Sequence, residues 1–122
     1  QRLGSFAQSL GLEVLVEIHE QEEIEKIGTA VDVVGVNNRD LTRFKVDVAT
    51  SHELFSSLPQ GLVKISESGL NDPKAVVDLR DRGYDGFLIG EYFMRDAQPG
   101  RRCREFIQQI RHLEDLLKEA IA

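Results

Sequence analysis

The strict alternation of short apolar runs with amphipathic segments is the feature that most constrains this fold. The apolar runs lie at residues 12–18, 31–36, 61–66 and 85–90, and a segment with helical spacing of its apolar residues follows each of them. Short, near-continuous apolar runs are typical of strands buried on both faces of a parallel sheet. Parallel strands that are joined by helices define the α/β fold class.

Helices are predicted between these strands and at both ends of the chain. The expected helical segments are residues 1–10, 19–27, 50–58, 72–83 and the last part of the chain. Thr50 and Glu53 have the spacing of a capping box, and Asp72 followed by Pro73 is typical of the first turn of a helix. The last helix presents one apolar face, formed by Cys103, Phe106, Ile107, Ile110, Leu113 and Leu117.

A helix followed by four βα units matches half of a (β/α)8 (TIM) barrel, although four parallel strands can also form a small open sheet by themselves. A complete barrel needs about 250 residues, whereas this chain has 122. No linker or shift in composition divides residues 1–122, so we expect a single segment. Because the first residue is Gln1 rather than methionine, we expect the missing N-terminal half of the barrel to precede it in a longer protein. Unpaired edge strands favour self-association of the isolated chain, for example as a homodimer.

Composition and charge limit the partners and the compartment. A formal net charge of −6 disfavours a surface that neutralises many nucleic-acid phosphates. No apolar run approaches the roughly 20 residues of a membrane-spanning helix, and no secretory signal opens the chain. The single cysteine, Cys103, is assigned to the core, and the three histidines have no metal-ligand spacing. We therefore expect a cytoplasmic protein that has no metal and binds neither nucleic acid nor membrane.

Polar residues end all four predicted strands, and ligands of parallel α/β proteins bind at the carboxyl ends of strands. The candidate positions are Glu17 with His19, Asn37 to Asp40, Glu67 to Gly69, and Gly90 with Glu91. A charge at the end of a buried strand is unfavourable unless it is paired or functional. Glu17 is therefore interpreted as a general base with a raised pKa, or as one partner of an ion pair with a strand-end lysine or arginine.

The other candidate positions also allow two interpretations. Asn37 can bind a sugar hydroxyl and Arg39 a carboxylate or phosphate, or both belong to an ordinary βα turn. Gly69, with Ser68 beside it, and Gly90 can let backbone amides approach a phosphate, or they only permit tight turns. Two such glycines at neighbouring strand ends make a phosphate site a hypothesis of equal weight to the turns.

The four strand-end motifs, taken in order, resemble the second half of indole-3-glycerol phosphate synthases. They are Leu12–His19, Val34–Leu41, Ser66–Gly69 and Phe87–Glu91. The resemblance implies a lyase of tryptophan biosynthesis that folds as a (β/α)8 barrel and uses no metal or organic cofactor. The implied substrate is 1-(2-carboxyphenylamino)-1-deoxyribulose 5-phosphate, which cyclises and loses carbon dioxide and water.

The same resemblance implies roles for individual residues. Glu17 matches the family's catalytic glutamate, the general base of the dehydration. Asn37 and Glu67 match residues that bind and orient the substrate and support the ring-forming chemistry, so they are predicted to be catalytic together with Glu17. Arg39 belongs to the same loop of the family motif and, with Ser68, is predicted to bind the substrate. The phosphate-binding positions are matched by Ser68, Gly69, Gly90 and Glu91. Many members carry a small hydroxylated residue in place of Glu91, so its carboxylate is expected to turn away from the phosphate.

The resemblance also implies what residues 1–122 lack. The family's catalytic lysines, including the general acid, belong to the first half of the barrel, so we expect the isolated chain to be inactive. An acid opposite the base is needed to protonate a carbonyl or a leaving hydroxyl, and the strand ends here offer no lysine.

Two alternatives remain at this point. Another phosphate-binding barrel, such as an isomerase or epimerase, would place an aspartate or cysteine acid/base pair at opposing strand ends. A non-catalytic α/β module that dimerises or binds phosphate would have its start codon directly upstream of Gln1.

Overall fold

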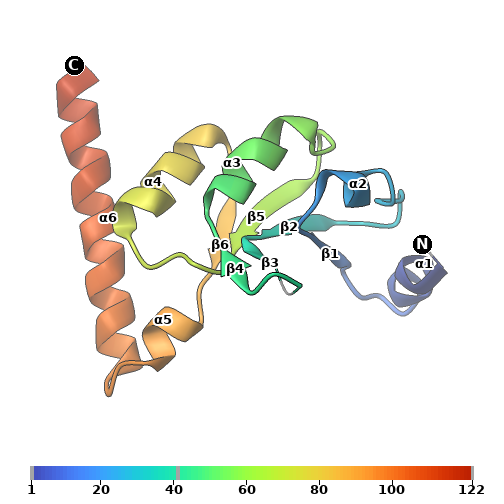
Figure 1. The fold of residues 1–122 in the computed structure, drawn as a ribbon, viewed down its shortest axis with the longest axis horizontal. Helices are drawn as coiled ribbons and strands as arrows, with labels where there is room; N and C mark the ends of the chain where they lie inside the picture. The colour runs from blue at the N-terminus through green and yellow to red at the C-terminus, as the bar shows by residue number, and fades with distance from the viewer. Residues whose placement is uncertain (1, 41, 122) are drawn as a thin grey trace.

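A computed structural model describes residues 2–40 and 42–121, so Leu41 of the second motif lies outside the described residues. Its main sheet has four parallel strands in the order β1 (Leu15–Ile18), β2 (Val33–Asn37), β5 (Val63–Glu67) and β6 (Gly86–Leu88) (Figure 1). Each predicted apolar run therefore contains one strand. The α/β prediction is confirmed, and the order of the strands is that of half a (β/α)8 barrel.

The helices follow the predicted alternation. They are α1 (Arg2–Ser9), α2 (Gln21–Ile24), α3 (Ala49–Leu54), the 3₁₀ turn η1 (Phe55–Ser57), α4 (Pro73–Arg82), α5 (Glu91–Met94) and α6 (Pro99–Ile121). Asp72 caps α4 as predicted, because its carboxylate accepts a hydrogen bond from the Lys74 amide at 3.0 Å. Gly83 ends α4 with a φ of 127°, a conformation that favours glycine.

Two details of the helix prediction are wrong. The segment 19–27 forms only the single turn α2, which begins with a capping box in which the Glu23 carboxylate accepts hydrogen bonds from the amides of His19 and Glu20. Beyond it the amides of Lys26 and Ile27 bond to the carbonyls three residues earlier, so the α-helix does not continue. The capping box of Thr50 and Glu53 does not form, because α3 begins before Thr50 and the Asp47 carboxylate accepts from the Ala49 amide at 2.9 Å.

An antiparallel hairpin in the β2–α3 connection was not predicted. It pairs β3 (Arg39–Asp40) with β4 (Lys45–Val46). The Asp40 carboxylate accepts hydrogen bonds from the amides of Thr42 and Arg43 and so stabilises the bend of the hairpin. The connection that begins at Arg39 is therefore an ordered structure rather than the ordinary βα turn of the alternative interpretation.

The hydrophobic core lies between one face of the sheet and the helices. Its buried side chains are Ile18, Val34, Val36, Leu54, Leu58, Leu70, Val76, Leu79, Tyr84 and Phe106. The helix α6 packs along α4 at one end of the molecule, and α1 lies at the opposite end (Figure 1). Cys103 is half-buried and is not among the buried side chains of this core, so its assignment to the core is wrong. No helix within the described ranges is long and apolar enough to cross a membrane.

The opposite face of the sheet is open. Strand side chains alternate between the faces, so Leu15, Val63 and Leu88 point away from the core, and each is about half exposed. The apolar face of α1 is open as well, with Leu3 82% and Phe6 62% exposed. In a closed barrel the open face of the sheet would be the interior.

Candidate functional site

The predicted site residues gather at the carboxyl edge of the sheet. Asn37 and Glu67 are paired neighbours at the ends of β2 and β5, and Glu17 lies one residue before the end of β1. Gly90 and Glu91 follow β6 and begin the short helix α5. Parallel strands thus bring together side chains that are up to 74 residues apart in the sequence, as the positions 17 and 91 show.

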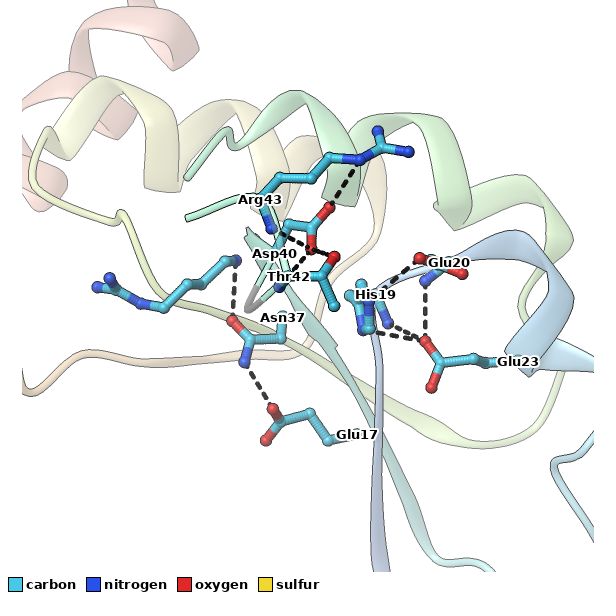
Figure 2. Close-up of polar contacts among 9 residues, drawn as sticks. Glu17, His19, Glu20, Glu23, Asn37, Asp40, Thr42 and Arg43 are labelled. Atoms are coloured by element: carbon cyan, nitrogen blue, oxygen red, sulfur yellow. Dashed lines mark hydrogen bonds and ion pairs between the residues drawn. The ribbon is translucent and has the colours of Figure 1, made fainter. Parts of the chain in front are cut away.

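Asn37 connects the first glutamate to the hairpin. Its Nδ2 donates a hydrogen bond to Glu17 Oε1 at 2.6 Å, and its Oδ1 accepts one from the Arg39 amide at 3.0 Å (Figure 2). Hydrogen bonds at its nitrogen and at its oxygen therefore fix the orientation of the Asn37 side-chain amide. Within residues 2–40 and 42–121 Glu17 forms no ion pair, which removes the alternative of a lysine or arginine partner on this chain. His19 is paired instead with Glu20 and Glu23 at the start of α2.

Glu67 is the buried carboxyl of the site. It is 5% exposed, and among the described residues no hydrogen-bond donor reaches its Oε2. Burial and, after it, the negative charge of the neighbouring Glu17 together raise the pKa of Glu67 to about 7. A carboxyl with this pKa holds a proton for about half of the time at neutral pH, and the protonated form can donate it to Glu17.

A glycine in the neighbouring strand makes room for that carboxyl. A Cβ atom on Gly35 would lie 2.1 Å from Glu67 Oε2 and 3.1 Å from its Cδ. The sequence marks Gly35 only as an interruption of an apolar strand. An isolated glycine in a strand often signals a close approach of another group, and that signal would have pointed to this position.

Glu67 should make the free energy of unfolding depend on pH. Its pKa of about 7 in the folded protein lies above the ordinary value of 4.5 for a glutamate, so its protonated form stabilises the fold below pH 4.5. That contribution is lost as the pH rises through 7. We expect a loss on the order of 2–3 kcal/mol between pH 4.5 and 8 relative to Glu67→Gln, at about 1.4 kcal/mol per pH unit. Chemical denaturation of both proteins over this range measures the difference.

The neutral glutamine of Glu67→Gln is the matched control, because it keeps the shape of the side chain. The other charged groups nearby are Glu17 on β1 and, around the adjoining cavity, Arg39, Glu91 and Arg95. If the difference in the free energy of unfolding between the parent protein and Glu67→Gln stays constant from pH 4.5 to 8, the raised pKa of Glu67 is contradicted.

The two glycine turns border a cavity of about 460 Å³ beside Glu67. Its lining includes Arg39, Ser68, Gly69, Gly90, Glu91 and Arg95. Ser68 and Gly69 have φ values of 72° and 69°, in the left-handed region. Glycine is favoured at position 69 for two reasons: its φ lies in the left-handed region, and a Cβ there would lie 2.5 Å from Val46 Cγ1 of the hairpin. Gly90 has an ordinary φ of −123° and open space around it, so its backbone stays accessible from the cavity.

Glu91 bridges two arginines at the edge of this cavity. Its Oε2 lies 2.7 Å from Arg39 Nη2, and its Oε1 pairs with Arg95. The Arg95 guanidinium, and after it Arg39, holds the pKa of Glu91 below its usual value. Both oxygens of the Glu91 carboxylate are thus engaged by arginines that line the cavity. Arg95 was not among the predicted site residues, although its spacing of four residues from Glu91 on a helix predicts the pair.

The strand order, the helices on one face and the polar side chains at the carboxyl ends of the strands define a chain of the (β/α)8-barrel class. The family model described as indole-3-glycerol phosphate synthase matches residues 1–106. The chain belongs to the indole-3-glycerol phosphate synthase family. The resemblance seen in the motifs is therefore confirmed, and it replaces the alternative of a phosphate-binding isomerase or epimerase.

Curated relatives of this family match most of the chain. The indole-3-glycerol phosphate synthase of Bacteroides thetaiotaomicron is 48% identical over 110 residues, which are 90% of this chain and 42% of that protein. The enzyme of the same name from Salinibacter ruber is 48% identical over 99 residues, 80% of this chain and 37% of that protein. That from Caldanaerobacter subterraneus is 42% identical over 107 residues, 87% of this chain and 41% of that protein. The chain spans about two fifths of the length of these relatives.

Proposed function

We propose that residues 1–122 form strands five to eight of an indole-3-glycerol phosphate synthase barrel in a longer, cytoplasmic protein. The complete protein would convert 1-(2-carboxyphenylamino)-1-deoxyribulose 5-phosphate to the indole product of tryptophan biosynthesis with loss of carbon dioxide and water. The observation that supports this best is the group of Glu17, Asn37 and Glu67 at one edge of the sheet, next to a cavity bordered by Gly69 and Gly90.

In this proposal the two glutamates have different tasks. Glu17 is the general base that removes a proton during the dehydration, and Asn37 fixes the direction of its carboxylate through the 2.6 Å hydrogen bond. Glu67, whose pKa is raised to about 7, would donate a hydrogen bond from its protonated form to an oxygen of the substrate while Glu17 stays a carboxylate. Arg39 supplies a guanidinium fork for a carboxylate of the substrate.

The cavity would take the phosphate of the substrate. The Ser68 hydroxyl and the backbone amides around Gly69, Gly90 and Glu91 are the groups that would donate hydrogen bonds to its oxygens. The cavity volume of about 460 Å³ is ample for one phosphate group. The side chain of Glu91 takes no part in this contact, because its two oxygens are directed at arginines.

Replacing Glu91 with serine is expected to lower the KM for the anionic substrate about tenfold at low ionic strength. The change removes a carboxylate that competes with the substrate for Arg39 and Arg95, and it removes one negative charge from the phosphate cavity. Because the salt screens charges at an exposed site, the gain should shrink in 0.5 M salt. Steady-state kinetics at two salt concentrations measure it.

Glu105→Gln is the matched control for this change. Glu105 forms an i,i+4 ion pair with Arg101 on α6 as Glu91 does with Arg95, and it does not line the cavity. An equal change of KM in both variants, or a KM that rises in Glu91→Ser, would show that Glu91 does not compete with the substrate.

The activity is expected to require the first half of the barrel. The carboxyl ends of the four sheet strands provide two glutamates and an asparagine, and the acid opposite Glu17 would come from the missing half. The test is an indole fluorescence assay on the complete protein encoded around this segment, with residues 1–122 assayed alongside. Activity in the complete protein and none in the segment supports the proposal. A complete protein without activity would overturn it and favour a non-catalytic module.

The isolated segment is also expected to self-associate. The open sheet face with Leu15, Val63 and Leu88 and the α1 face with Leu3 and Phe6 leave large apolar side chains in water. Covering these faces removes that apolar surface from water, whether a second copy or the first half of the barrel does so. Light scattering and thermal melts of residues 1–122 check this, and a monodisperse monomer that unfolds cooperatively would contradict it.

A further inference from the structure

A buried group of polar side chains lies directly beneath the site and is not used by the proposed chemistry. Asn38 is 2% exposed, and Ser51 and Ser66 are fully buried. Asn38 Oδ1 accepts hydrogen bonds from Ser51 Oγ at 2.7 Å and from the Ser51 amide at 3.1 Å. Ser51 Oγ and Ser66 Oγ are 2.6 Å apart and share a further hydrogen bond. The group therefore ties the end of β2 to α3 and β5.

Asn38 also holds the turn that follows β5. Its Nδ2 donates to Ser66 Oγ at 3.1 Å and to the Ser68 carbonyl at 3.0 Å, and its backbone amide donates to the Glu67 carbonyl at 2.8 Å. Ser68 has a φ of 72°, which is unfavourable for a residue with a side chain. The hydrogen bonds from Asn38 thus fix the carbonyls on both sides of a strained position, next to the buried carboxyl of Glu67.

We propose that Asn38 is a positioning residue, which holds Glu67 and the Ser68–Gly69 turn in register with Glu17 and the cavity. This inference rests on the proposed function, since the groups that Asn38 fixes are those assigned to the substrate. Asn38 does not face the cavity and acts through its neighbours. Its side-chain oxygen and nitrogen are both fully engaged, so no apolar residue of similar volume can replace it without leaving Ser51 and the Ser68 carbonyl unsatisfied.

The network has a far end that serves as a control. Tyr84, which is buried in the core, donates from its hydroxyl to the Ser51 carbonyl at 2.7 Å. Removing this hydroxyl weakens the same network but leaves both hydrogen bonds from Asn38 to the β5 turn in place. Tyr84→Phe therefore reports a loss of stability without a loss of positioning.

The test compares Asn38→Ala and Tyr84→Phe in the complete protein. We expect Asn38→Ala to lower kcat about thirtyfold or more, because Ser66 and the Ser68 carbonyl lose their side-chain donor and the turn beside Glu67 loses its fixed position. Tyr84→Phe should stay within about twofold of the parent. Both variants should lower the melting temperature. Loss of stability in both with kcat near the parent value in both would overturn the positioning role.

A second measurement does not depend on activity. The ¹³C shift of the Glu67 carboxyl against pH should titrate near the parent midpoint in Tyr84→Phe and at a lower midpoint in Asn38→Ala, where water reaches the carboxyl. Equal midpoints in the two variants would overturn the inference even if the parent protein proved inactive. An inactive parent protein would by itself overturn only the proposed function and not the positioning role of Asn38. If Asn38→Ala does not fold, Asn38→Ser, which keeps one hydroxyl in the network, is expected to show the same two effects at reduced size.

Discussion

Replacing Glu17 with glutamine in the complete protein is expected to lower kcat about a hundredfold or more while KM changes little. The glutamine keeps the size of the side chain and can still face Asn37, whose side-chain amide lies 2.6 Å from Glu17 Oε1. It cannot accept the proton that a general base removes, so the interaction lost is one that develops in the transition state. Steady-state kinetics that separate kcat from KM measure the effect.

Glu13→Gln is the control for Glu17→Gln. Glu13 is an exposed glutamate four residues earlier, before the start of β1 and away from the strand ends. Its kinetics should match those of the parent. A change confined to KM in Glu17→Gln, with kcat unaltered, would remove the role of Glu17 as base and leave it a substrate-binding group.

Gly35→Ala is expected to lower kcat between tenfold and a hundredfold with a change in melting temperature of only a few degrees. The added methyl would lie 2.1 Å from Glu67 Oε2, so the carboxyl must move. It is the far end of a flexible side chain, and its displacement strains the backbone little. The variant therefore separates the position of Glu67 from the stability of the sheet, and kinetics and thermal melts together measure both.

Gly86→Ala provides the comparison within the same sheet. A Cβ on Gly86 would lie 3.2 Å from Ile65 Cγ2 and has no contact with Glu67. This variant should retain nearly full activity. If Gly35→Ala also remains fully active, the exact location of the Glu67 carboxyl has no bearing on turnover.

The sequence was sufficient for the elements that depend on apolar periodicity. The four strands, the start of α4 at Asp72 and Pro73, and the long α6 all lie where their patterns predicted. The hairpin at Arg39 could not be found in this way, because its two strands have only two residues each and do not alternate. Short polar pairings of this kind depend on contacts with the rest of the fold.

Glu17, Asn37 and Glu67 were predicted as site residues from their places at strand ends, but the contacts among them were not predicted. The raised pKa of Glu67 follows from its burial and from the proximity of Glu17, and both depend on the register of three strands and on the space above Gly35. The contacts of Asn38 join residues that are 13 to 30 positions apart. No periodic pattern encodes such pairs, and for this reason the sequence predicts no separate role for Asn38 within the candidate range 37–40.

The one-sided core separates two events in the formation of a barrel. The buried apolar cluster lies on the helix-covered face of the sheet. The strand-end turns and the Asn38 contacts lie beside it and are formed among residues 2–40 and 42–121. Closure of the barrel then adds the opposing wall to a surface whose geometry has already been set. If the proposed function holds, errors in that closure would deprive the site of its acid, while the turns at Gly69 and Gly90 on this side would keep their shape.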